Sequence, residues 1–211
     1  MTSDSQAVQK VPMFPLGVVL LPGSILPLHI FEDRYKQLSQ HCIESQSQFG
    51  VVLIERGQEV GGGDERASVG CLAEIIQSDL MPDGRSNLLV LGTSKIGVQE
   101  WHLDAPYPIA SVVEVHEASN DTSILRARKV LRQFSNFVQK AKLSGYELPE
   151  IDEDAMAIGL EATELSYRIA DLLPAGPFDR QRMLAALGSE ERLTVIEDHL
   201  EGLEEILDSR G

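Results

Sequence analysis

Cysteine and long hydrophobic runs are both scarce in this sequence of 211 residues. The two cysteines, Cys42 and Cys71, cannot form a disulfide framework or, by themselves, a four-ligand zinc site. The longest apolar stretch, around residues 18–21, is broken by Pro22 and Gly23 and falls far short of the ~20 residues that cross a bilayer. The first ten residues contain no apolar segment of the kind that a signal peptide requires. We therefore expect a cytoplasmic protein with no membrane partner.

Basic residues are also few, with 18 Lys and Arg against 33 Asp and Glu, for a formal charge of −15. A protein that neutralises phosphates needs a cationic surface, so this balance disfavours nucleic acid and anionic lipid as partners. The imbalance is uneven, because residues 145–211 carry 17 acids and 5 bases whereas residues 1–144 carry 16 acids and 13 bases. Such an acidic C-terminal part is typical of a soluble protein.

The common catalytic motifs are missing as well. A phosphate-binding loop needs glycines followed by Lys and Ser or Thr at the start of a helix, but Gly61–Gly63 is followed by two acids. The segment Gly92–Lys95 lacks the upstream glycine and leads into a strand. The G-x-S-x-G motif of a nucleophile elbow is absent, and neighbouring strand residues such as Ser94 and Lys95 point to opposite faces. We expect a protein that is not an enzyme and that uses no cofactor.

Metal-binding patterns are weak too. None of the five histidines stands in an H-E-x-x-H arrangement. His41 and Cys42 are adjacent in an expected helix, and adjacent helical side chains do not converge on one ion. Cys71 could approach them in the fold, but three scattered ligands predict no site. We therefore expect no metal, with both cysteines as small buried hydrophobic residues.

Short strands are indicated over the first half of the chain. Residues 11–31 are apolar runs interrupted by four prolines and two glycines, which exclude a helix. Tyr35, Leu38 and Cys42 then share one face of a short amphipathic helix. Further strands are predicted in this order: residues 49–55, 68–80, 86–93, 95–102 and 107–115, with a turn at 81–85. Such closely spaced strands favour a closed barrel or a sandwich.

Apolar residues recur at helical spacing from residue 120 onward. One stripe runs from Ala127 to Ala141 and a second from Ile158 to Leu172. A short helix is expected over residues 178–187, and a last one carries the stripe Leu193 to Leu207. The change of period predicts a domain boundary near residues 117–121.

Four residues are candidates for ligand contact. Phe31, Arg34 and Tyr35 cluster at the first helix, where the two aromatic residues are expected to anchor the helix and Arg34 to pair with a nearby acid. Trp101, the only tryptophan, ends a strand. Core packing explains it, but tryptophan is also enriched at binding hot spots, so a partly exposed ring that grips a partner is the alternative.

The segment FPLGVVLLPGSILPLHIFEDRY, residues 14–35, closely resembles the opening of the Lon protease N-terminal domain, the substrate-recognition region of the ATP-dependent Lon proteases. Similar segments follow in family order: V-G-x-x-A-x-I at residues 69–75, a Pro-Asp-Gly hairpin at 82–84, a Tyr-Pro pair at 107–108 and a helical close at 192–193. Lys95 stands where the family usually has arginine. The resemblance covers residues from about 11 to 207.

This resemblance implies an α+β fold, in which a PUA-like β pseudo-barrel of about six strands and a short helix precedes a C-terminal helical bundle. We place a flexible N-terminus at residues 1–10, the barrel at 11–118 and the helical part at 119–211. The sequence contains neither the ATPase nor the peptidase residues of the full protease. We therefore expect a free-standing bacterial Lon-domain protein without catalytic activity.

The function that the resemblance implies is recognition of exposed apolar segments in client polypeptides, together with a protease or chaperone component. The proline-broken runs at residues 18–21 and 25–30 are candidate walls of such a site, although most of their side chains are expected in the core. An adaptor or scaffold that docks a partner, or a second copy as a homodimer, through the stripe Leu193 to Leu207 is the alternative. RNA binding rests on fold analogy alone, and the charge of −15 opposes it.

Overall fold

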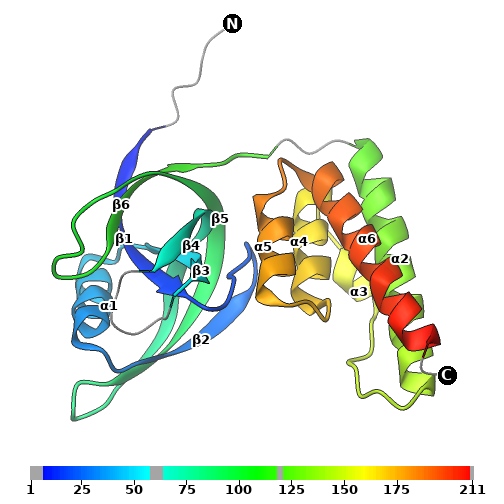
Figure 1. Cartoon of the computed structure of the whole chain (residues 1–211), viewed down its shortest axis with the longest axis horizontal. Coiled ribbons are helices and arrows are strands. Elements are labelled where there is room, and N and C mark those ends of the chain that lie inside the picture. Colours follow the sequence, from blue (N-terminus) through cyan, green and yellow to red (C-terminus); the bar gives the residue numbers. More distant parts are fainter. Residues whose placement is uncertain (1–6, 58–63, 118–120, 210–211) are drawn as a thin grey trace, which may run out of the picture. The chain divides into compact units, whose positions relative to one another are not determined.

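The computed structural model describes residues 7–57, 64–117 and 121–209, and it divides the chain into two compact units, Met1–His116 and Glu117–Gly211 (Figure 1). The described part of the first unit contains six strands and one helix, and that of the second contains only helices. This arrangement confirms the predicted α+β class. Part of the expected flexible N-terminus, residues 1–6, lies outside the described residues, as do the Gly61–Gly63 loop and residues 118–120.

One six-stranded sheet forms the first unit, in the order β2-β5-β4-β3-β1-β6. Its elements, in chain order, are β1 (Gln9–Leu16), β2 (Ile25–Ile30), α1 (Asp33–Ser45), β3 (Phe49–Arg56), β4 (Glu65–Leu80), β5 (Ser86–Trp101) and β6 (Ile109–Glu114). The first half of β5 pairs with β2 and the second half pairs with β6, which closes the barrel. The two strands predicted at 86–93 and 95–102 are therefore wrong as separate elements, because β5 is continuous through residue 94.

Side chains that alternate in direction along the strands form two hydrophobic cores. In β1, Met13 belongs to one cluster and its neighbour Phe14 to the other, as successive strand residues must point to opposite faces. The smaller cluster joins residues of β1, β3, β4, β5 and β6, including Val52 and Ile96. The larger cluster includes Tyr35 of α1, so the helix covers that side of the sheet.

The segment between β1 and β2 packs closely against β5 at Gly92. The amide of Gly23 donates to the carbonyl of Gly92 over 2.8 Å, and the amide of Gly92 donates to the carbonyl of Ser24 over 2.9 Å. A Cβ at position 92 would collide with the carbonyl oxygen of Leu21. Glycine thus lets this segment turn inward, so that Leu20 and Leu21 are buried, and returns the chain outward into β2.

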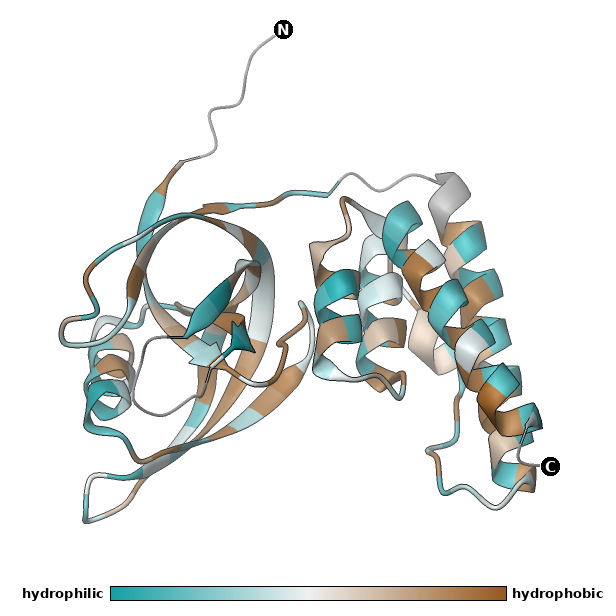
Figure 2. Cartoon of the chain, in the orientation of Figure 1, coloured by the Kyte–Doolittle hydropathy of each residue, from teal (hydrophilic) through white to brown (hydrophobic). Residues whose placement is uncertain are grey.

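The second unit consists of α2 (Asp121–Leu143), α3 (Glu153–Ala157), α4 (Ala162–Leu172), α5 (Pro177–Ala185) and α6 (Ser189–Asp208). Hydrophobic bands alternate with hydrophilic ones along α2 and α6 in Figure 2. The stripe predicted from Ala127 to Ala141 is buried, which confirms it. The second predicted stripe was too long, because Ile158 lies outside α4 and is 77% exposed. No helix among the described residues has the length and hydropathy to cross a membrane.

The α6 stripe is already used inside its own unit. Leu193, Ile196, Leu200 and Leu207 are all buried, and α6 packs against α2, α4 and α5. Amphipathic helices bury their apolar face against another element, and here that element belongs to the same chain. Leu203, the remaining residue of the predicted stripe, is half-buried, and docking of a second copy through this stripe stays a prediction.

Candidate functional site

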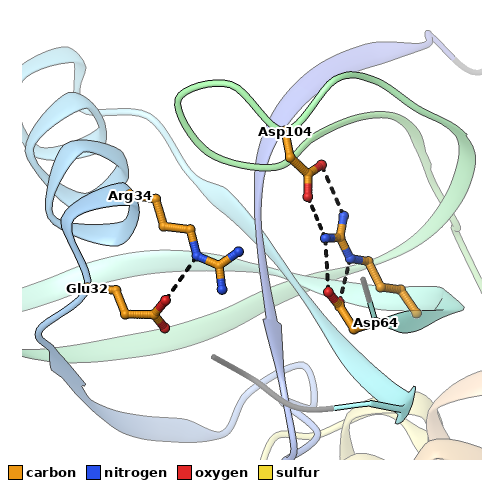
Figure 3. Close-up of polar contacts among 5 residues, drawn as sticks. Glu32, Arg34, Asp64 and Asp104 are labelled. Carbon is orange, nitrogen blue, oxygen red and sulfur yellow. Dashed lines mark hydrogen bonds and ion pairs between the residues drawn. The ribbon is translucent and has the colours of Figure 1, made fainter. Parts of the chain in front are cut away.

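Arg66, at the start of β4, is the centre of a group of paired side chains. Its guanidinium lies 4.5 Å from the centroid of the Trp101 ring at the end of β5, within the range of a cation–π contact. The same group donates to Asp64 and to Asp104, each over 2.6 Å (Figure 3). We call these four residues the Arg66 cluster. It ties the beginning of β4 to the end of β5 and to the loop that follows β5.

The electrostatics of the Arg66 cluster favour the charged forms. Burial pushes the pKa of Asp64 upward, but the hydrogen bonds and charge of Arg66 outweigh it and hold that pKa below its usual value. Burial likewise lowers the pKa of Arg66, and the two carboxylates outweigh this and raise it. The side chain of Asp64 is 3% exposed, so its charge depends on Arg66 for compensation.

Arg34 and Tyr35 form a second paired arrangement beside it. Nε of Arg34 donates to Glu32 over 3.2 Å, and its guanidinium lies 4.5 Å from the centroid of the Tyr35 ring. Tyr35 is buried and stacks on Phe14 with ring centroids 4.0 Å apart. Burial raises the pKa of the Tyr35 hydroxyl to about 12. The predicted roles of Tyr35 as an anchor of α1 and of Arg34 as the partner of an acid are thus confirmed. The same anchoring role predicted for Phe31 is wrong, because that side chain is 51% exposed.

A different surface is formed where β2, β5 and the second half of β4 lie side by side. The register places His29, Asn87 and Asp79 in one row across the three strands and Pro27, Leu89 and Gln77 in the next. The side chains that point away from the core form what we call the outer face: Ile25, Pro27, His29, Phe31, Glu74, Gln77, Asp79, Asn87, Leu89 and Leu91. Their inward neighbours Leu28, Ile30, Leu88 and Val90 are buried.

Apolar side chains on the outer face are open to solvent. Ile25 is 59% exposed, and Phe31, which directly follows β2, is 51% exposed. The Phe31 ring stacks on His29 with centroids 6.1 Å apart. A cavity of about 400 Å³ lies among Pro27, Leu89 and their neighbours in the three strands. A β-bulge between Ile75 and Gln77 also leaves Ile76 of β4 exposed.

The two cysteines of the barrel are buried, and the acidic residues form no metal-binding group in the described part of the chain. Cys42 and Cys71 are both buried free thiols in the larger core, and burial raises the pKa of Cys71 to about 12. Such thiols are poor nucleophiles because the thiolate is the reactive form. No group of three or more His, Cys, Asp or Glu side chains in the described residues could hold a metal ion.

The second unit contains its own enclosed arginine. Arg192 of α6 is fully buried, and its guanidinium donates to both carboxylate oxygens of Glu117 over 2.6 and 2.8 Å. It also donates to Ser166 and lies 3.5 Å from the centroid of the Tyr167 ring. The Tyr167 hydroxyl donates to Glu117 as well. All these groups belong to the helical unit and stabilise it.

The structure divides the four candidate residues between two regions. Arg34, Tyr35 and Trp101 belong to paired or buried groups, whereas Phe31 lies on the outer face. Residues 25–30 were candidates from the sequence, but Leu89 and Asp79 were not expected as their neighbours on the outer face. The strand pattern of residues 86–91 could have predicted the outward position of Leu89, because every second residue of a strand faces away from the core.

Comparisons with known proteins agree with one another. The model of the family described as the ATP-dependent protease La (LON) substrate-binding domain matches residues 10–202. A Lon protease of Roseiflexus castenholzii is 31% identical over 218 residues, which cover 98% of this chain and 26% of that protein. The chain spans about a quarter of the length of the curated Lon proteases that it matches first.

Two solved structures share the fold. A Lon N-terminal domain protein from Xanthomonas campestris has 26% identity and a TM-score of 0.63, with 88% of this chain and 95% of that chain covered. The N-terminal domain of the Mycobacterium avium complex Lon protease has 18% identity and a TM-score of 0.68, with 92% and 98% covered. The second likeness shows the fold alone, and both agree with the strands followed by helices described above.

Proposed function

The chain belongs to the family of the Lon protease substrate-binding domain, and on that premise we propose that it binds exposed apolar segments of other polypeptides on its outer face. The binding surface is formed by β2, β5 and the second half of β4. Arg34, Tyr35 and Trp101 support the barrel behind it, and Phe31 contacts the bound segment.

The observation that carries this proposal is the exposure of Ile25 and Phe31 beside the cavity of about 400 Å³. Contiguous exposed apolar groups on a soluble protein are often interaction sites, since they gain free energy only when a partner covers them. Leu89 and Leu91 continue the apolar surface along β5. An unfolded client offers apolar side chains of the kind that such a surface buries.

The client is bound by side-chain contacts on the face rather than by extension of the sheet. β2 stands at the end of the strand order and pairs only with β5 in the described sheet. An exposed strand edge can accept another strand, but Pro27 in the middle of β2 has no amide hydrogen to donate. The apolar face therefore remains the better surface for an extended segment.

The proposal includes no catalytic step. Both thiols are buried in the barrel core, and Asp64 and Asp104 are paired with Arg66. The proposal ends at capture of the client, and the component that receives it is a protease or a chaperone. The net charge of −15 also favours polypeptides over RNA as ligands.

Fluorescence anisotropy with a labelled, permanently unfolded polypeptide tests the proposal. The full chain should bind saturably, and the double variant Ile25→Ser/Phe31→Ser should bind at least tenfold more weakly, because two apolar contacts of about 1 kcal/mol each are lost. The matched control is Ile43→Ser/Leu103→Ser, since Ile43 and Leu103 are exposed apolar residues elsewhere on the first unit. It should bind within twofold of the unchanged chain.

Two results would overturn the proposal. One is the absence of saturable binding by the unchanged chain at tens of micromolar. The other is an equal loss of affinity in both double variants, which would mean that nonspecific hydrophobic contact, rather than the outer face, holds the polypeptide.

A further inference from the structure

The outer face carries two kinds of side chain in separate lanes. Ile25 and Pro27 on β2 and Leu89 on β5 form an apolar lane. Glu74 and Asp79 on β4 form an acidic lane on the same face, since the register sets Glu74 opposite Leu91 and Asp79 opposite Asn87. Both acids are exposed. The apolar and acidic lanes run along neighbouring strands.

Neither acid is neutralised by the chain itself within the described residues. Glu74 has no ion pair there, and Asp79 accepts only a hydrogen bond of 3.3 Å from the neutral Gln77 amide. The nearest turn, residues 81–85, does contain Arg85, but its guanidinium pairs with Asp83 over 2.7 Å. The acidic lane therefore presents a negative potential toward anything that lies on the outer face.

The row of polar side chains at one end of the apolar lane ends in a carboxylate. Nδ1 of His29 lies 2.7 Å from the side-chain oxygen of Asn87. The strand register continues this row to Asp79 on β4. A cationic group of a client can pair with this carboxylate, whereas a client carboxylate would meet like charge.

We infer that the outer face selects apolar segments that also carry Lys or Arg, and that it discriminates against apolar segments that carry Asp or Glu. The inference rests on the proposed function and specifies its substrate class. Adjacent strands are about 4.8 Å apart, so Asp79 on β4 lies one strand away from Leu89 on β5 and two strands, about 10 Å, away from Pro27 on β2. A long basic side chain near an apolar anchor in the client spans that distance. The anchor lies against Leu89 while the cation reaches Asp79.

The test uses three labelled peptides with one apolar core sequence and two Lys, two Gln or two Glu residues beside it. The unchanged chain should bind the Lys peptide about tenfold more tightly than the Glu peptide at low salt, with the Gln peptide between them. Because exposed charges are screened within about 8 Å at 0.15 M salt, the preference should shrink as salt is raised. Anisotropy titrations give all three dissociation constants.

The variant Glu74→Gln/Asp79→Asn should reduce the preference for Lys over Glu to about twofold, because the Lys peptide loses an attraction and the Glu peptide loses a repulsion. Its matched control is Glu201→Gln/Glu205→Gln, which removes the same two charges from the exposed surface of α6. The control should keep the tenfold preference. A control that loses the preference as fully as the β4 variant would assign it to net charge and overturn the inference.

The failure of this inference and the failure of the proposed function give different results. Equal affinity of the unchanged chain for the Lys, Gln and Glu peptides, with saturable binding of each, overturns the charge selection and leaves polypeptide binding in place. No saturable binding of any of the three peptides overturns the proposed function, and the inference falls with it.

Discussion

Charges are paired with counter-charges in the enclosed arginine clusters, whereas the acids on the outer face have no such partners among the described residues. Arg66 and Arg192 each combine an aromatic ring with carboxylate partners, one in each unit, so that the charges are compensated where water is scarce. On the outer face, by contrast, Glu74 and Asp79 stand beside exposed apolar side chains. Groups that satisfy one another hold a fold together, whereas groups left open to solvent are available to a partner.

The largest effect on stability should come from Arg192→Met. Glu117, which is 3% exposed, would be left as a buried charge without its main partner, and such losses reduce the free energy of unfolding by about 3–5 kcal/mol. Urea unfolding followed by far-ultraviolet circular dichroism reports the helical unit. Trp101 fluorescence reports the first unit, and its transition should shift less.

Arg182→Met is the control for this substitution. Arg182 is largely exposed and pairs with Asp179 at 3.9 Å, so its loss should change the free energy of unfolding by less than about 0.5 kcal/mol. Adding Glu117→Gln to Arg192→Met should recover part of the lost stability, because the isolated charge is removed. A loss equal to that of Arg182→Met would show that the enclosed ion pair is not the source of stability.

A smaller loss, about 2–3 kcal/mol, is expected for Arg66→Met, because Asp64 would lose its charged hydrogen bonds. The effect should depend on pH. The depressed pKa of Asp64 stabilises the unchanged chain above about pH 4, and this stabilisation is lost as the pH falls through the lower folded-state pKa. In the variant, Asp64 stays buried but loses the hydrogen bonds and the charge of Arg66, so its pKa rises and stability should start to fall at a higher pH.

Thermal melts between pH 3 and pH 7 measure this difference. The control is Arg56→Met, since the pair of Arg56 with Glu65 is exposed and 3.7 Å long. It should follow the pH profile of the unchanged chain. If Arg66→Met also followed that profile, compensation of Asp64 would not stabilise the cluster. Trp101 emission should change in Arg66→Met alone, because the guanidinium no longer covers the ring.

The arrangement of strands and helices was largely predictable because it depends on local patterns. The stripe from Ala127 to Ala141 and the proline-broken strands at residues 11–31 follow from periodicity and from backbone restrictions. The continuity of β5 was not predictable in the same way. Its two halves pair with different strands, and that long-range pairing overrides the local polar sequence at residues 92–95.

The candidate site was predictable only in part. Phe31 was singled out from the sequence, but its place on the outer face depends on the pairing of β2 with β5. Trp101 was also singled out from the sequence, but its contact with Arg66 depends on the fold and was not expected. The role of Asp79 depends on the register across β4, β5 and β2. A single sequence does not contain that register, because residues far apart in the chain determine it.

The smallest effect on stability is expected for Ile25→Ala, and its comparison with Ile30→Ala contrasts surface and core within one strand. Ile25 and Ile30 are the first and last residues of β2, and they are 59% and 1% exposed. Ile30→Ala should lower the free energy of unfolding by about 2–5 kcal/mol, since it leaves a cavity in the core. Ile25→Ala should lower it by less than about 0.5 kcal/mol, because water already surrounds the side chain. Urea unfolding of the two variants measures both values.

Comparable losses of stability in the two variants would place Ile25 in the core and remove the apolar anchor from the outer face. A loss confined to Ile30, together with weaker peptide binding by Ile25→Ala, would show that the same residue type serves the fold at one end of β2 and a partner at the other.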